Sequence, residues 1–208
     1  MNAHTLESQT KMTPESALQE LKEGNVRFTQ QKELNRDLLL QVKQTSTGQY
    51  PFATVLSCID SRVSSELIFD QGIGDIFSVR IAGNFVNEDI LGSMEFACKL
   101  AGTKLVLVLG HTACGAVKGA CDHARLGNLT ALINKIEPAV KAVSEPEDES
   151  LRNSSNIDFV NAVAQKNVQM TIDNIRSSSE VLAEMEQNGE IKIMGGMYDI
   201  HTGTVHFY

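Results

Sequence analysis

Two short segments of the chain carry the residue types best suited to chemistry. Cys58 precedes Asp60 and Arg62, and His111 precedes Cys114 by three positions. Two thiolates and one imidazole suit zinc, which favours tetrahedral nitrogen and sulfur ligands and, in catalytic sites, leaves a fourth position to water. We therefore expect Cys58, His111 and Cys114 to bind Zn²⁺.

Asp60 and Arg62 lie beside these expected ligands and carry opposite charges. A bidentate ion pair would keep the Asp60 carboxylate ionised and fix its direction. Asp60 would then accept a hydrogen bond from a zinc-bound hydroxide. Released from Arg62, it would instead displace the water and become the fourth ligand of a closed site. We expect both residues to be catalytic.

The elements that must position these residues alternate between strand and helix. Four apolar runs without polar alternation predict strands buried on both faces, at 52–58, 76–81, 104–109 and 190–194. Helical patterns lie between them, at 64–69, 89–100 and 113–123. This order predicts an α/β fold with a mostly parallel central sheet, about four parallel strands, flanked by helices. Thr202-Gly203 predicts a hairpin turn that adds an antiparallel edge strand.

The two reactive segments begin where strands are expected to end, and carboxyl ends of parallel strands are where sites are built. Cys58 and Asp60 face one point if the backbone stays extended between them. We expect a helix to begin near Ala113. His111 and Cys114, three apart at its start, would face together, and that start would favour a thiolate at Cys114.

The chain has 208 residues, of which 42% are hydrophobic, so one well-filled core is expected. We expect a single domain over 1–208 with an N-terminal helical arm at about 13–45. The first helix should end near Gly24 or soon after. The acidic segment 144–150 is expected to be an exposed connection before an amphipathic helix that starts at about Ile157.

Composition excludes several classes of protein. A net charge of −8 without a block of lysine and arginine argues against nucleic-acid and anionic-membrane partners. The longest apolar run, 104–110, is far below the roughly 20 residues of a membrane span. The first ten residues do not resemble a secretory signal, so we expect a cytoplasmic protein whose cysteines are thiols or metal ligands. Cys98 and Cys121 are expected to be small buried hydrophobes.

The spacing Cys58-x-Asp60-x-Arg62, followed by His111-x-x-Cys114 and Gly115, closely resembles the paired motifs of the beta carbonic anhydrases. The resemblance implies a zinc enzyme that catalyses the reversible hydration of carbon dioxide to bicarbonate and a proton by zinc-bound hydroxide. It covers roughly Ala17 to the C-terminus and continues through 74–84, 92–96, 110–116 and 195–199.

The resemblance also implies substrate-binding positions. Gln49, nine places before Cys58, is similar to the family's polar substrate-side residue, and Phe77 and Ala82 to its pocket walls. Gly115 is similar to a glycine whose backbone N–H faces the substrate. The family's pocket is typically assembled between subunits, which implies a dimer or tetramer. Ala82 replaces a common valine of the family, and a tyrosine often stands where this chain has phenylalanine at position 96.

Three alternatives share these residues. Cys58, His111 and Cys114 could hold a structural zinc or be buried thiols, although such a site needs no charged pair beside it. Related enzymes of this architecture hydrolyse carbon disulfide or carbonyl sulfide. A non-catalytic, zinc-stabilised interaction protein would keep Asp60 permanently on the metal, and the intact Arg62 argues against it.

Several other residues carry weaker expectations. His123, His201 and His206 are candidate proton shuttles and are expected to be surface histidines. Arg80, which closes a strand, is expected to be a structural ion-pair partner. Val55 stands where allosteric members of the family carry a tryptophan, and the chain has no tryptophan, so we do not expect their regulatory bicarbonate site.

Overall fold

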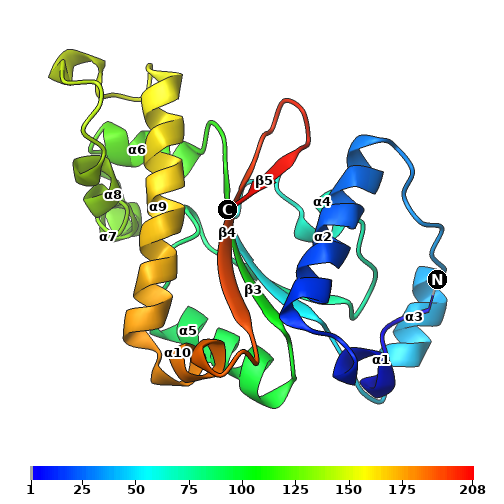
Figure 1. Ribbon diagram of the computed structural model, residues 1–208. Coiled ribbons are helices and arrows are strands. Elements are labelled where there is room, and N and C mark those ends of the chain that lie inside the picture. Colours follow the sequence, from blue (N-terminus) through cyan, green and yellow to red (C-terminus); the bar gives the residue numbers. More distant parts are fainter. Residues whose placement is uncertain (1) are drawn as a thin grey trace.

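The structure, a computed structural model, describes residues 2–208 and is built around one five-stranded sheet (Figure 1). The strand order is β2-β1-β3-β4-β5, with the first four parallel and β5 antiparallel to β4. The predicted α/β fold, with its antiparallel edge strand, is therefore confirmed. The strands are β1 Ala53–Ser57, β2 Ile76–Arg80, β3 Leu105–His111, β4 Lys192–Tyr198 and β5 Val205–Phe207.

Helices cover both faces of the sheet (Figure 1). They are α1 Leu6–Thr10, α2 Pro14–Thr29, α3 Leu38–Thr45, α4 Ser65–Ile68, α5 Glu88–Glu95, α6 Gly115–Cys121, α7 Gly127–Ile133, α8 Glu137–Ala142, α9 Ile157–Ser178 and α10 Glu180–Gln187. A π-helical turn, Phe96–Leu100, continues α5, and a 3₁₀ turn, Glu149–Leu151, precedes α9. Within residues 2–208, no helix has both the length and the apolar composition needed to cross a bilayer.

The central strands β1 and β3 are buried on both sides because most of their side chains are apolar, and their polar residues Thr54, Ser57 and His111 are buried as well. Leu105, Leu107 and Leu109 of β3 face a core that contains residues of α2 and α4. Val106 and Val108 face the opposite core, to which α5, α9 and α10 contribute. A third cluster, formed by α6 to α9, closes one end of the sheet. The uninterrupted apolar runs of the sequence thus reflect two-sided burial.

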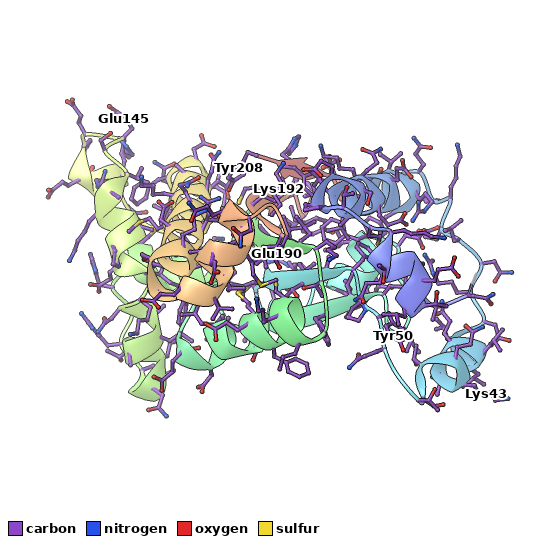
Figure 2. All side chains as sticks on the ribbon, turned by 60° about the horizontal axis from the view of Figure 1, so that its bottom comes forward. Lys43, Tyr50, Glu145, Glu190, Lys192 and Tyr208 are labelled. Atoms are coloured by element: carbon purple, nitrogen blue, oxygen red, sulfur yellow. The ribbon has the colours of Figure 1, made fainter. Side chains whose placement is uncertain are left out.

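The N-terminal segment is fastened to the sheet by polar contacts. Gln9 of α1 donates to the carbonyl oxygens of Pro51 and Ala101. α2 continues to Thr29, beyond Gly24, and the missing Cβ of that glycine lets the helix lie close to the Phe69 carbonyl oxygen. Figure 2 shows Lys43 of α3 and Glu145, in the acidic connection before α9, at opposite ends of the molecule.

Candidate metal centre

The sheet topology brings the two reactive segments together. β1 pairs directly with β3, with Ser57 opposite Leu109. Cys58 therefore leaves the sheet beside the end of β3. The sequence placed the end of that strand at Leu109, but β3 continues to His111, which pairs with Tyr198 of β4. His111 is thus the last residue of a buried strand and is fully buried itself.

A turn at Ala113 brings Cys114 back toward Cys58. Ala113 has a φ of 53°, in the left-handed region, and Cys114 is the N-cap of α6, which begins at Gly115. The expectation that helical spacing would align His111 and Cys114 is therefore wrong, because the helix begins after both. The two Sγ atoms lie 3.9 Å apart, and all three potential ligand atoms lie within 4.8 Å of one another.

The tautomer of His111 follows from its neighbour. Its Nδ1 lies 3.0 Å from the carbonyl oxygen of Thr112. Because a carbonyl only accepts, Nδ1 carries the hydrogen and Nε2 presents a lone pair. Nε2 is buried and has no hydrogen-bond partner within residues 2–208. Leaving such a group unpaired costs about 1–3 kcal/mol, so the imidazole and the two thiols fit a bound zinc ion.

The two thiols ionise unequally. The hydrogen bond that Cys58 shares with Cys114 lowers the pKa of Cys58 to about 4 against the effect of burial, with help from the Gly83 N–H at 3.4 Å. The pKa of Cys114 is raised by that same hydrogen bond and by burial. The shared hydrogen bond therefore favours the thiolate at Cys58, while the backbone N–H groups of Ala116 and Val117 at the start of α6 lower the pKa of Cys114 in the expected direction.

Asp60 and Arg62 form the bidentate pair anticipated from their spacing. Arg62 donates from Nε to Oδ1 at 2.9 Å and from Nη2 to Oδ2 at 2.7 Å, and its backbone N–H donates to Oδ1 at 3.0 Å. These bonds hold the pKa of Asp60 well below its usual range. Oδ2 accepts a single bond from Arg62 and lies 3.9 Å from His111 Nε2. An ionised carboxylate oxygen therefore faces the ligand group.

Three side chains without a sequence signal for the site, those of Arg80, Asn161 and Asn167, hold its backbone. Arg80 was expected to be an ion-pair partner, but it donates to the carbonyl oxygens of Cys58, at 3.0 Å, and Asp60, at 2.7 Å. Asn161 and Asn167 of α9 bond to the two loops beside the ligands. No local pattern marks these residues, because each acts on a segment distant in sequence.

The expected substrate positions do not all lie at this chain's ligand group. Gln49 precedes β1 and Phe77 pairs with Thr54 near the start of that strand, whereas Cys58 follows its carboxyl end. Gln49 is exposed between α3 and β1, and Gly115 is exposed at the start of α6 with open space where a side chain would project. The Phe77 ring meets that of Phe96 edge-on, with centroids 6.2 Å apart. Ala82 is half-buried just after β2. Their roles in substrate binding stay predictions.

The remaining cysteines and histidines match their expected environments. Cys98 and Cys121 are buried free thiols, and burial raises the pKa of each to about 11, which makes them poor metal ligands. The histidines outside the metal group that were considered as shuttles, His123, His201 and His206, are exposed.

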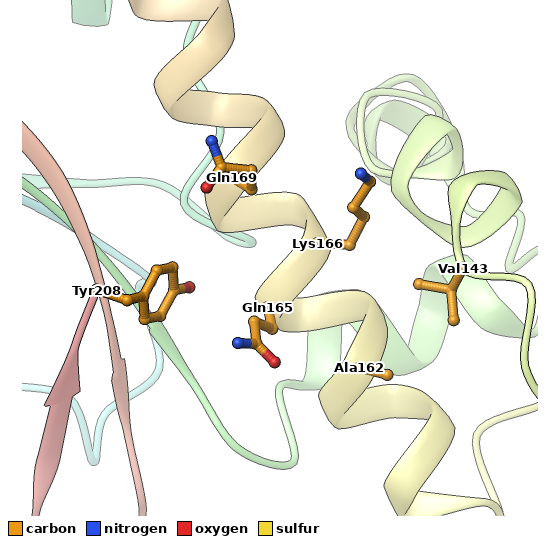
Figure 3. A pocket seen from close by; sticks show the side chains of 6 residues that line it. All are labelled: Val143, Ala162, Gln165, Lys166, Gln169 and Tyr208. Carbon is orange, nitrogen blue, oxygen red and sulfur yellow. The ribbon is translucent and has the colours of Figure 1, made fainter.

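A separate cavity of about 370 Å³ lies between the outer face of α9 and Tyr208 (Figure 3). Its ionisable side chains are those of Lys166 and Tyr208, and none of its lining residues belongs to the Cys58–His111–Cys114 group. The convergent ionisable groups needed for chemistry are at the strand ends instead. The cavity is lined by Val143, Ala162, Gln165, Lys166, Gln169 and Tyr208.

Comparison with known proteins agrees with this geometry. A model of the carbonic anhydrase family matches residues 53–205. Carbonic anhydrase 2 of Mycobacterium tuberculosis is 32% identical over 196 residues, covering 91% of this chain and 90% of that protein. The beta-carbonic anhydrase CafA of Aspergillus fumigatus superimposes with a TM-score of 0.73 at 25% identity, covering 93% of this chain and 89% of that one. This chain belongs to the beta class of the carbonic anhydrase family.

A tetrameric beta-carbonic anhydrase from Sordaria macrospora has the same fold. It superimposes with a TM-score of 0.67 at 22% identity, covering 80% of this chain and 88% of that chain.

Proposed function

We propose that this protein is a zinc-dependent carbonic anhydrase that catalyses the reversible hydration of carbon dioxide to bicarbonate and a proton. The observation that carries the proposal is the buried Cys58–His111–Cys114 group, whose unpaired Nε2 and two thiols lie beside an ionised Asp60. Family membership supports it. When bound, zinc would acidify a water molecule and so supply a nucleophile for carbon dioxide.

Asp60 orients that nucleophile. Its Oδ2 faces the ligand group, 3.9 Å from His111 Nε2, and would accept a hydrogen bond that orients the nucleophile toward carbon dioxide. Arg62 keeps the carboxylate ionised, so that it can only accept. In a closed state, Asp60 would leave Arg62 and its carboxylate would bind the metal together with Cys58, His111 and Cys114, which would stop turnover. The Asp60 side chain would thereby have a catalytic conformation, paired with Arg62, and a regulatory conformation on the metal.

The substrate side of the site combines apolar and polar groups. Phe77 and Ala82 form the apolar wall for carbon dioxide, and the Gly115 N–H and the Gln49 amide bind its oxygens. Gln49 and Phe77 act from a neighbouring subunit, so the protein works as a dimer or tetramer. The tetrameric relative from Sordaria macrospora supports this assembly. The free cysteines favour a reducing compartment, the cytoplasm.

The test is stopped-flow carbon dioxide hydration by the zinc-loaded protein between neutral and alkaline pH, compared with Asp60→Asn at equal zinc content. We expect turnover that rises into the alkaline range, because two thiolates donate more charge to the metal than neutral imidazoles do. The rate should collapse in Asp60→Asn. A zinc-replete but inactive wild-type protein would refute the proposal and favour carbon disulfide or carbonyl sulfide as substrate, or a structural metal.

A further inference from the structure

Helix α9 borders the metal centre without contributing a ligand. Its apolar side chains pack in the core beneath β3 and β4 (Figure 1). Asn167 lies on this buried side and is only 3% exposed. A buried carboxamide is costly unless its hydrogen bonds are made, so its partners show what the residue does.

Asn161 fixes the turn between two ligands. Its Oδ1 accepts a hydrogen bond of 2.8 Å from the backbone N–H of Ala113. Ala113 adopts a left-handed conformation that alanine rarely occupies, and it lies between His111 and Cys114 in the chain. The bond therefore stabilises the turn that sets the direction of Cys114 relative to His111.

Asn167 acts on the third ligand through Gly83. Its Nδ2 donates to the Gly83 carbonyl at 2.7 Å, and the Gly83 N–H donates to Cys58 Sγ at 3.4 Å. Gly83 has a φ of +81°, and a Cβ there would lie 2.4 Å from Cδ1 of Ile136. Only glycine fits this turn, and glycine is the residue with the greatest backbone freedom. The Asn167 bond restrains that freedom, so the Gly83 N–H stays directed at the sulfur.

We propose that Asn161 and Asn167 are positioning residues of the metal centre, through which one rigid helix sets the direction of Cys114 and the electron donation of Cys58. The two side chains act on loops that flank the ligand group from opposite parts of the sequence. Partners of this kind typically change metal affinity 10–100-fold. This inference rests on the zinc site of the proposed function.

The experiment compares full-length variants for zinc binding rather than for activity. Asn161→Leu removes the acceptor for Ala113, and Asn161→Asp retains it. Asn167→Leu removes the donor to Gly83. The matched control is Gln165→Leu, which introduces leucine on the exposed face of α9, beside the cavity in Figure 3. The zinc dissociation constant is measured by competition with a chromophoric chelator. For the cobalt-substituted proteins, the position of the thiolate-to-cobalt absorption band is recorded.

We expect the zinc dissociation constant to rise about 10–100-fold in Asn161→Leu and Asn167→Leu. It should stay within about threefold of wild type in Asn161→Asp and Gln165→Leu. The cobalt band should move in Asn167→Leu, because the hydrogen bond to Cys58 Sγ changes. Circular dichroism and urea unfolding of the metal-free proteins identify variants that have lost their fold.

Folded leucine variants with wild-type zinc affinity and cobalt spectrum would overturn the inference, as would an equal loss of affinity in Gln165→Leu. If Asn167→Leu does not fold, the comparison of Asn161→Leu with Asn161→Asp decides, since Asn161 is only half-buried. Wild-type protein that binds no zinc would refute the proposed function itself, which keeps the two failures distinct.

Discussion

Arg62 donates two parallel side-chain hydrogen bonds to Asp60, from Nε to Oδ1 and from Nη2 to Oδ2. This fork geometry is specific to a guanidinium and cannot be reproduced by an ammonium group. The two residues are separated by one position, and both lie within a turn between Cys58 and α4. The direction of the Asp60 carboxylate therefore depends on the identity of its partner as well as on its charge.

The first prediction is that Arg62→Lys lowers carbon dioxide hydration about 10–100-fold at equal zinc content, because lysine keeps the charge but loses the fork. Stopped-flow rates and zinc analysis check it. Arg125→Lys, at an exposed arginine that faces Glu137, is the control and should be silent. A fully active Arg62→Lys enzyme would show that charge alone suffices.

The second prediction concerns Asp70, a buried carboxylate paired with Arg27 and Arg36. Burial raises its pKa, but the two arginines outweigh burial, and the net pKa lies below the ordinary 3.8. The ion pairs therefore stabilise the fold fully above the ordinary pKa, and this stability is lost as pH falls through the lower folded-state pKa. Asp70→Asn leaves buried Arg36 without its carboxylate and Arg27 with only its 3.6 Å contact to Glu20, and should cost about 3–5 kcal/mol at neutral pH.

Urea unfolding of wild type and Asp70→Asn from neutral pH to below pH 3.8 measures this effect. The difference in unfolding free energy should shrink at the acid end of the range. Asp37→Asn, at an exposed helix cap, is the control. A difference that does not change with pH would contradict the assignment to ionised Asp70.

The third prediction compares two glycines. Gly83→Ala should destabilise the protein by about 2–4 kcal/mol, because its positive φ and the nearby Ile136 side chain both oppose a Cβ. Gly92→Ala should stabilise it by about 0.5–1 kcal/mol, because Gly92 lies in α5 with no atom within 4 Å of a Cβ position. Thermal unfolding of both variants gives the sign, and a stabilising Gly83→Ala would contradict the turn geometry.

The fourth prediction concerns metal stoichiometry. Cys58→Ala should abolish tight zinc binding, whereas Cys98→Ala should retain one zinc per chain, because burial keeps the Cys98 thiol protonated.

Removing zinc from wild type should lower its unfolding free energy by mass action. The expected loss is about 4 kcal/mol relative to protein at a free zinc concentration 1,000 times the dissociation constant. Metal analysis and calorimetry measure both, and loss of zinc from Cys98→Ala would contradict this ligand set.

The strands and the two reactive motifs were predictable from sequence because their signals are local. Uninterrupted apolar runs such as 104–109 indicate two-sided burial, and Cys58 and His111 fall at their ends. The wrong prediction of the helix start near Ala113 also arose from local sequence. The helix expected near Ala113 begins at Gly115, because the intervening turn is left-handed, and helical periodicity carries no information about such a turn.

The sequence by itself determined the fold class, the expected ligand types and the pairing of Asp60 with Arg62, because periodicity, residue chemistry and short spacing are properties of neighbouring residues. Only the tertiary structure decided that β1 lies beside β3, that the Cys58 and Cys114 thiols are in contact, and that Asn161 and Asn167 hold the loops. These features depend on contacts between segments 48 to 84 positions apart, which exist only once the sheet has assembled and α9 has packed against it.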